Sequence, residues 1–242
     1  MEYKDTIKEE NWKRKYLKSI DGNTALKLFS EFMPEKHINE EFNKSLIVKD
    51  LPFNKAKIIS KTKVRNRKGL VYQYLEGPTL KDLMKSEIDP GKHMSYLTTL
   101  HKDILNIKAP NQCESYKKII RPRILKPRTD NVLITKEEKK EALRILDGLP
   151  EGDNLCHGSL KPSNIIISGE EAYAIDLMTI SKGPALYDIA RTYYNLDKRH
   201  KVKSAEDLER RMAFAALYLE EMGTSLEEIK DYLFLVKLIK KE

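Results

Sequence analysis

The residues of this sequence that could do chemistry gather in its C-terminal half, where an amide and a carboxylate adjoin short apolar runs. Asn164 directly precedes "IIIS", and Asp176 follows a second run, "AYAI". If these runs pair as a hairpin, the amide oxygen and the carboxylate lie close together, and magnesium prefers such hard oxygen ligands. A buried carboxylate also needs a compensating partner, which a metal ion would supply. The sequence therefore predicts a magnesium site at Asn164 and Asp176.

Lys27 could place a positive charge on a phosphate group. It lies in "ALKLF" between Leu26 and Leu28, an alternation typical of a strand with one buried face. The amphipathic segment that follows carries Glu41, which could pair with this lysine, and Glu40 is the neighbouring candidate. A cation for the phosphates, a carboxylate that orients it and oxygen ligands for magnesium are three requirements of phosphoryl transfer. The fourth is a group that receives the proton of the substrate.

Short strands around one helix must position Lys27. The runs "KYLKSI" and "TALKLF", joined by Asp21, Gly22 and Asn23, predict a β-hairpin. A helix is expected from Pro34 to about Val48, because apolar residues recur there every four positions. The runs "KAKIIS" and "GLVYQYL" then predict a second pair of strands.

Beyond "YLEGPTL" the sequence is mainly helical. One long helix is expected over about residues 92–107. Capping residues mark the ends of further helices, at Thr79 to Asp82, Thr135 to Glu138, Gly148, Gly223 and Ser225 to Glu228. We therefore expect an α+β protein with a small β-rich lobe at residues 1–74, built of an antiparallel sheet and one helix. A helical lobe at residues 75–242 would carry the loop and hairpin of Asn164 and Asp176.

The stretch "LCHGSLKPSNIIISGEEAYAIDLMTISKGPALYDIART" resembles the catalytic core of the aminoglycoside phosphotransferase and choline kinase group of kinase-like proteins. The likeness extends upstream to "GLVYQYLEGPTL", which is similar to the last strand of the small lobe and the hinge, and to "LTTLHKDILNIKAP", which is similar to the helix before the catalytic loop. The resemblance implies a bilobal protein-kinase-like fold over nearly the whole chain, with ATP and Mg²⁺ as cofactors.

The resemblance also implies how a nucleotide would bind. Lys27 would hold the α- and β-phosphates, with Glu41 as its ion-pair partner. The residues Tyr74, Leu75 and Glu76 would face the adenine through backbone groups.

The catalytic loop receives its expected roles from the same resemblance. Asn164 and Asp176 would bind the metal, Asp188 would hydrogen-bond the loop in a structural role, and His157 would brace the loop rather than do chemistry. Family members carry an aspartate, which accepts the proton of the substrate hydroxyl, where this chain has Ser159. A serine cannot serve as a base unaided, and losing a general base typically costs about 10²- to 10⁴-fold in rate. Positioning and the metal would still provide much of the rate.

The expected phosphate loop is a second departure. Between the presumed strands at Thr6-Ile7 and Tyr16, the stretch "KEENWKRKYLK" contains no glycine, although glycines let backbone N–H groups approach phosphates. The basic residues 13–15 could offer charge instead. We therefore predict that Trp12 to Lys18 binds an anion, either the nucleotide phosphates or an acidic macromolecular partner. A solvated charged turn is the alternative.

Composition limits the class of protein. The charged fraction of 34%, the charged start "MEYKDTIKEE" and an apolar run, Met212 to Leu219, that is too short to cross a bilayer predict a cytoplasmic protein without a membrane partner. Cys113 and Cys156 are too few for a disulfide framework. The net charge of +8 favours acidic partners and disfavours polycationic aminoglycosides as substrates.

Three functions fit these observations. The first is a phosphotransferase that binds ATP and Mg²⁺ and transfers phosphate weakly or unusually to a hydroxyl of an unknown small-molecule or protein substrate. The second is a pseudokinase that acts as a nucleotide-gated protein-interaction module, because the base and the glycines are missing. The third is a basic scaffold that binds no nucleotide. Residues that recognise the substrate are expected at about 190–242.

Overall fold

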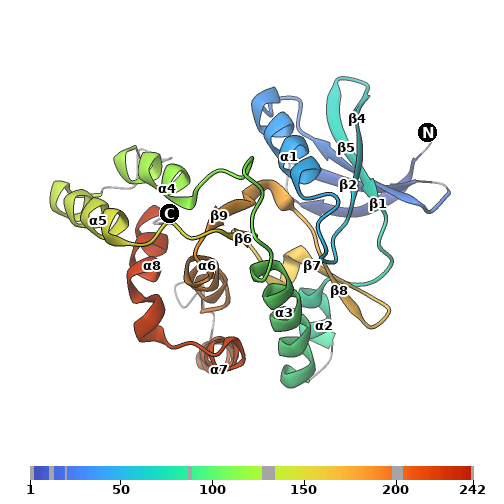
Figure 1. Cartoon of the computed structure of the whole chain (residues 1–242). Coiled ribbons are helices and arrows are strands. Elements are labelled where there is room, and N and C mark those ends of the chain that lie inside the picture. The colour runs from blue at the N-terminus through green and yellow to red at the C-terminus, as the bar shows by residue number, and fades with distance from the viewer. Residues whose placement is uncertain are drawn as a thin grey trace.

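The computed structural model describes residues 3–10, 14–19, 21–86, 89–126, 134–197 and 204–240. An antiparallel sheet with one helix forms the N-terminal part, and helices form most of the C-terminal part (Figure 1). The α+β architecture expected from the sequence is confirmed. The division of the chain into two lobes at residues 74 and 75 stays a prediction.

The N-terminal sheet has the strand order β1-β2-β3-β5-β4, so β3 lies inside it between β2 and β5. Its strands are β1 (Tyr3–Glu10), β2 (Arg14–Ser19), β3 (Thr24–Phe29), β4 (Ile58–Val64) and β5 (Arg67–Gln73). The predicted hairpin of β2 and β3 is confirmed: Asp21 accepts a hydrogen bond from the Asn23 backbone in its turn, and Gly22 has a φ of +77°. Helix α1 (Glu35–Ile47) packs Ile38 on the sheet beside Phe29 and Leu70.

Strand β4 differs from its prediction. The run "KAKIIS" predicts a strand that ends at Ser60, whereas β4 begins at Ile58 and continues to Val64. Because β4 is an edge strand of the sheet, the exposed side chains of Lys61 and Lys63 can lie in it without a burial cost. Arg65, with a φ of 53°, then turns the chain into β5.

Seven helices occur in the described residues of the C-terminal part. They are α2 (Leu80–Ser86), α3 (Pro90–Leu105), α4 (Tyr116–Leu125), α5 (Lys136–Gly148), α6 (Ala185–Asp197), α7 (Ala205–Met222) and α8 (Leu226–Ile239). The capping boxes that begin at Thr135 and Ser225 are both present, and Gly223 ends α7 with a φ of 67°. The helices α4 and α6 were not among those predicted.

Short strand pairs and turns lie between α5 and α6. Strand β6 (Asn154–Cys156) pairs with β9 (Ser181–Gly183), and β7 (Ile165–Ser168) pairs with β8 (Glu171–Ala174). The 3₁₀ turns η1 (Pro162–Asn164) and η2 (Leu177–Thr179) adjoin the β7–β8 hairpin. This hairpin is the one that the apolar runs predict.

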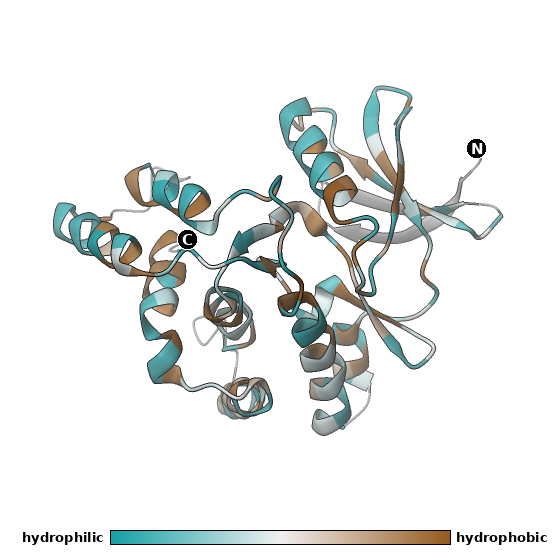
Figure 2. Ribbon diagram, in the orientation of Figure 1, coloured by the Kyte–Doolittle hydropathy of each residue, from teal (hydrophilic) through white to brown (hydrophobic). Residues whose placement is uncertain are grey.

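The largest hydrophobic core holds the C-terminal part together. Its helices are amphipathic, with hydrophobic and hydrophilic residues on different sides (Figure 2). Helix α6 is mostly buried, and it carries polar residues into the core at Asp188, Arg191 and Thr192. Buried polar groups of this kind require partners. No helix in the described ranges is both long and apolar enough to span a membrane.

The linker from β5 to α2 lies against the β7–β8 hairpin. The Ile167 backbone donates to the Pro78 carbonyl at 3.0 Å. Gly77 has a φ of +143°, and a Cβ at this position would lie 1.8 Å from the Ile167 carbonyl oxygen. On the other side, the Ala56 backbone donates to the Ala174 carbonyl at 3.0 Å. The hairpin is thus fixed to segments on both sides of β4 and β5.

Candidate active site

Lys27 lies between two carboxylates that come from distant parts of the chain. Its Nζ donates to Glu41 Oε1 at 2.5 Å and to Asp176 Oδ1 at 2.9 Å. Lys27 is 2% exposed and Glu41 is fully buried, whereas the Asp176 side chain is 23% exposed. The structure therefore brings together one predicted residue each from β3, α1 and the end of the β7–β8 hairpin. Glu40, the other candidate, lies at the surface beside His37.

Tyr72 joins this cluster and was not predicted from the sequence. Its hydroxyl donates to Glu41 Oε1 at 3.0 Å. Burial, and then the nearby Glu41 carboxylate, raise the pKa of Tyr72 well above its usual range, so that the hydroxyl keeps its proton. Lys27 pairs with Leu70 across the sheet, and Tyr72 lies two residues further along β5 on the same face. Strand alternation could have identified Tyr72 once the register was known.

Asn164 and Asp176 flank the β7–β8 hairpin at its open end. Asn164 Nδ2 donates to the Ser159 carbonyl at 3.0 Å, and the Asn164 carbonyl accepts from the Ile175 backbone at 2.9 Å. Asp176 has a φ of 63°, a left-handed conformation that costs about 1–2 kcal/mol for a residue with a Cβ. Such strain is characteristic of functional positions, where the surrounding structure enforces it.

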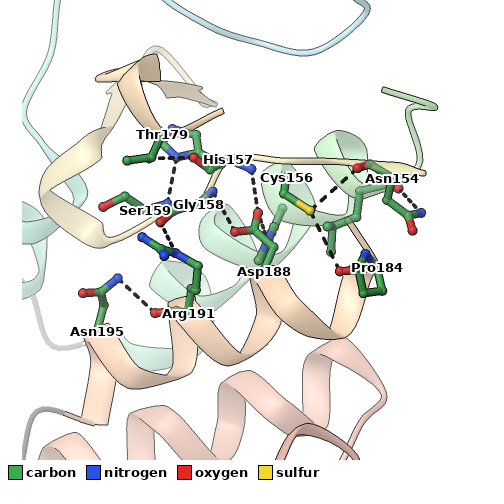
Figure 3. Close-up of polar contacts among 12 residues, drawn as sticks. Asn154, Cys156, His157, Gly158, Ser159, Thr179, Pro184, Asp188, Arg191 and Asn195 are labelled. Atoms are coloured by element: carbon green, nitrogen blue, oxygen red, sulfur yellow. Dashed lines mark hydrogen bonds and ion pairs between the residues drawn. The ribbon is translucent and has the colours of Figure 1, made fainter. Parts of the chain in front are cut away.

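Asp188 holds the loop that precedes the hairpin. It points from α6 toward this loop and accepts hydrogen bonds from the backbone N–H groups of His157 and Gly158, each at 2.7 Å (Figure 3). His101 Nε2 lies 3.2 Å from the same carboxylate, and Tyr218 Oη lies 2.8 Å from His101 Nδ1. Burial alone would raise the pKa of Asp188, but the hydrogen bonds from His101 and the loop hold it below its ordinary value. The carboxylate is therefore charged, and each of its oxygens accepts a hydrogen bond from the loop.

Two further side chains fix the loop from its carbonyl side. Arg191 Nε donates to the Gly158 carbonyl, and Thr179 Oγ1 donates to the His157 carbonyl at 2.8 Å (Figure 3). Gly158 has a φ of +74°, and a Cβ there would lie 2.5 Å from the Thr179 carbonyl oxygen. Neither Arg191 nor Thr179 was predicted. Arg191 could have been identified from the sequence, because it follows Asp188 by three residues and so shares a helix face with it.

The fold of the chain is similar to that of solved phosphotransferases. The amicoumacin kinase hAmiN, in a complex with AMP-PNP, Ca²⁺ and Ami, is similar with a TM-score of 0.65 at 13% identity, over 97% of this chain and 78% of that chain. The aminoglycoside phosphotransferase APH(3'')-Id from Streptomyces rimosus gives 0.61 at 14% identity, over 98% and 92% of the chains. APH(4)-Ia gives 0.66 at 14% identity, over 98% and 84%. The chain has the protein-kinase-like fold of the aminoglycoside phosphotransferases. No family model matches the sequence, and no curated protein does.

The segment Tyr74 to Glu76 lies in the linker between β5 and α2. The Tyr74 backbone donates to the Asn23 carbonyl at 3.0 Å, and Lys18 Nζ lies 4.0 Å from the centre of the Tyr74 ring. Leu75 is buried and Glu76 is exposed. Within the described residues, neither Leu75 nor Glu76 makes a hydrogen bond through its backbone. Their backbone groups can therefore accept or donate to a bound base.

Ser159 occupies the position in the loop at which an aspartate was expected from the resemblance to the kinase-like family. Its backbone N–H donates to His157 Nδ1 at 3.3 Å, and its carbonyl is held by Asn164. Its hydroxyl makes no hydrogen bond to the described residues. Burial lowers the pKa of His157, and the carboxylates of Asp188 and Asp176 oppose this shift only in part. The imidazole is therefore neutral, and one of its nitrogens orients the loop backbone.

The basic run Trp12 to Lys18 lies partly outside the described residues, and the side chains of residues 14–16 are not described either. Trp12 and Lys13 fall in the gap between β1 and β2, and β2 begins at Arg14. Anion binding by this run stays a prediction. Cys113 and Cys156 are free, buried thiols, as their number in the sequence indicated.

Proposed function

We propose that this protein binds a nucleoside triphosphate and a divalent metal ion at the Lys27–Glu41–Asp176 cluster, and that it transfers phosphate slowly to a hydroxyl of a small molecule. The observation that carries the proposal is a buried lysine on β3 held between two carboxylates, Glu41 of α1 and Asp176 after the β7–β8 hairpin. Relatives of the same fold support it, since one is a complex with AMP-PNP and Ca²⁺ and another is a complex with ADP and hygromycin B.

The cluster suits a triphosphate because its lysine is already oriented. Glu41 accepts a hydrogen bond from the ammonium group, and Tyr72 in turn donates to Glu41 and so helps to hold that carboxylate in place. Lys27 would contact the phosphates, and the backbone of Leu75 and Glu76 would hold the base. Such preorganised charge acts without reorganisation when the reaction occurs.

The residues beside the cluster fit a magnesium ion. Asn164 Nδ2 donates to the Ser159 carbonyl, so the amide oxygen of Asn164 is left as the atom that would bind the metal. Asp176 adds a carboxylate. Magnesium is commonly held by one or two carboxylates together with substrate phosphates and water, so this donor set is sufficient. The ion would neutralise negative charge on the phosphates during transfer.

The proposed transfer is slow because Ser159 stands where a general base would be needed. Its hydroxyl cannot accept the substrate proton at neutral pH, and losing a general base costs about 10²- to 10⁴-fold. His157 cannot replace the base, because it is fully buried and its Nδ1 accepts from the Ser159 backbone. The proton would then leave to solvent.

A pseudokinase is the second candidate, and Ser159 together with the missing glycines favours it. A nucleotide at Lys27 and Asp176 would touch both the N-terminal sheet and the β7–β8 hairpin. It would thereby favour one arrangement of the two parts, which a protein partner could recognise. The two candidates differ in turnover and not in nucleotide binding.

A calorimetric titration with AMP-PNP and Mg²⁺ tests the shared part of the proposal. Wild type should bind, and a nucleotide concentration 100 times Kd should add about 2.7 kcal/mol to the free energy of unfolding. Asp176→Asn should weaken binding and reduce its dependence on Mg²⁺. Lys63→Gln, an exposed lysine on β4, is the matched control and should bind like wild type. No binding at millimolar nucleotide, or equal binding by Asp176→Asn, would overturn the proposal.

A further inference from the structure

A cavity of about 760 Å³ adjoins the loop that carries Ser159. Its walls come from α1, α4, η2 and α6. Thr179 and Arg191 line it and are the residues that donate to the carbonyls of His157 and Gly158. A cavity of this size suits a small molecule. Its position places a bound molecule beside the catalytic loop.

Positive charge dominates the walls of this cavity. Of its fifteen lining residues, two are glutamates, Glu40 and Glu114, and six are lysine or arginine. The six are Lys44, Lys118, Arg121, Arg123, Lys126 and Arg191. They come from three helices and the residue after α4, so the fold and not one local charged run gathers them.

Part of this charge lacks a counter-charge. Arg121 forms an ion pair with Asp147, and Arg191 is bonded to the loop and to Tyr187. Across the described ranges, Lys44, Lys118 and Lys126 form no ion pair within 4.0 Å. Burial lowers the pKa of Lys44; Glu114 and Glu40 oppose this shift, and Arg123 adds to it. The cavity therefore holds cations that a bound anion would stabilise.

A second cavity, of about 530 Å³, has a smaller excess of positive charge. It is lined by residues of α2, α3, α6 and α7 together with Lys161. Its two arginines, Arg210 and Arg211, both pair with Asp207, at 3.1 and 3.0 Å. Lys81 and Lys161 also line the second cavity, so its five lysine and arginine side chains exceed its two aspartates by three, against an excess of four in the first cavity.

We infer that the phosphate acceptor is an anionic small molecule, bearing phosphate or carboxylate groups, which binds in the cavity between α1 and α4 through Lys44, Lys118 and Lys126. The inference rests on the proposed function and specifies its substrate class. A hydroxyl oxygen of the acceptor forms the new bond to the γ-phosphorus, the bond from that phosphorus to the β-phosphate oxygen breaks, and the hydroxyl proton goes to water. Polycations such as hygromycin B are repelled by the same walls.

Titration calorimetry with saturating AMP-PNP and Mg²⁺ tests this inference. The probes are glucose 6-phosphate and citrate, with glucose as the neutral comparison and hygromycin B as the polycation. Wild type should bind at least one anion at low salt, more tightly than glucose or hygromycin B. The double variant Lys118→Gln/Lys126→Gln should weaken that binding by about threefold to tenfold, as expected for two partly solvated charge contacts.

The control is Lys140→Gln, an exposed lysine on α5 that lines neither cavity and should leave anion binding unchanged. The inference is overturned if neither anion binds at millimolar concentration, if hygromycin B binds more tightly than both, or if the double variant and the control bind alike. AMP-PNP titrations of the same samples report on the proposed function separately. Nucleotide binding without anion binding overturns the inference alone, and anion binding without nucleotide binding overturns the proposed function.

Discussion

Glu41 is fully buried, and its Oε2 has no hydrogen-bond partner among the described residues. Its charge is balanced by Lys27 at 2.5 Å, with Tyr72 as a further donor. A buried carboxylate without its cation is costly. At the scale of single residues, the site is thus held by a pair in which each member requires the other.

Lys27→Met should therefore lower the free energy of unfolding by about 3–5 kcal/mol, because it leaves Glu41 uncompensated. The double variant Lys27→Met/Glu41→Gln should recover a large part of this loss, since the remaining group is neutral. Urea denaturation of the wild type, both single variants and the double variant measures the coupling. Additive effects of the two substitutions would contradict the interpretation of Lys27 and Glu41 as a coupled pair.

His157 should make stability depend on pH. Burial lowers its pKa from the ordinary value of 6.5, so at mildly acidic pH the unfolded chain binds a proton that the folded chain does not. The free energy of unfolding should then fall as pH drops below about 6.5, by at most about 1.4 kcal/mol per pH unit. His157→Gln keeps an acceptor for the Ser159 backbone and cannot titrate, so its stability should depend less on pH between 7 and 5. Identical slopes in denaturation at each pH would exclude this role.

At the scale of elements, the linker between β5 and α2 depends on a glycine. Gly77 combines a φ of +143° with an approach of 1.8 Å between an added Cβ and the Ile167 carbonyl oxygen on β7. The turn between β7 and β8 offers a comparison, because Gly169 has a φ of +62° and open space around it. The two glycines separate the cost of backbone strain from the cost of a steric clash.

Gly169→Ala should lower the free energy of unfolding by about 1–2 kcal/mol, the cost of a left-handed residue. Gly77→Ala should cost more, because the linker must also move away from β7, and the shift should weaken AMP-PNP binding. Thermal unfolding and calorimetry of both variants check this. Equal losses of stability, with unchanged nucleotide affinity, would show that the linker does not need its close contact with β7.

Elements with local signals could be predicted from the sequence, whereas those that depend on distant contacts could not. The capping boxes at Thr135 and Ser225 are made by residues three positions apart, so both are legible in the sequence. Helix α4 was missed because Pro122 lies inside it and basic residues surround its buried face of Tyr116, Ile120 and Ile124.

The predictions of site residues show the same difference between local signals and distant contacts. The loop and the hairpin could be predicted because their residues, from His157 to Asp176, lie close together in the sequence. The strand alternation around Lys27 likewise predicted that this side chain faces inward. His101 was not found, because it meets Asp188 from 87 positions away. Thr179 meets His157 from 22 positions away, and only the tertiary structure brings them together.

At the scale of the whole molecule, the net charge of +8 favours anions, and the cationic cavity between α1 and α4 concentrates this preference. In the sequence, the run Trp12 to Lys18 contributes four further basic residues, Lys13, Arg14, Lys15 and Lys18. Contacts of exposed charges weaken with salt, because the Debye length shrinks from about 10 Å at 0.1 M to about 3 Å at 1 M.

Replacing Lys13, Arg14 and Lys15 with glutamine should therefore lower the affinity for nucleotide, or for an acidic partner that co-purifies with the protein. The difference from wild type should be largest at low salt and shrink as salt rises. Calorimetry with AMP-PNP and Mg²⁺ at two salt concentrations, together with analysis of co-purifying material, gives the answer. Unchanged affinity for both kinds of ligand at low salt would leave a solvated charged turn as the interpretation.

The rate of phosphate transfer from ATP by Ser159→Asp tests most directly whether this is a phosphotransferase site that lacks its base. The substitution would place a proton acceptor in the loop held by Asp188, Arg191 and Asn164. We expect phosphate release from ATP, or transfer to an acceptor, to rise by about one to four orders of magnitude over wild type. The rise should be abolished in Ser159→Asp/Asp176→Asn. If Ser159→Asp binds nucleotide but turns over no faster than wild type, the central claim is contradicted and the pseudokinase interpretation is favoured.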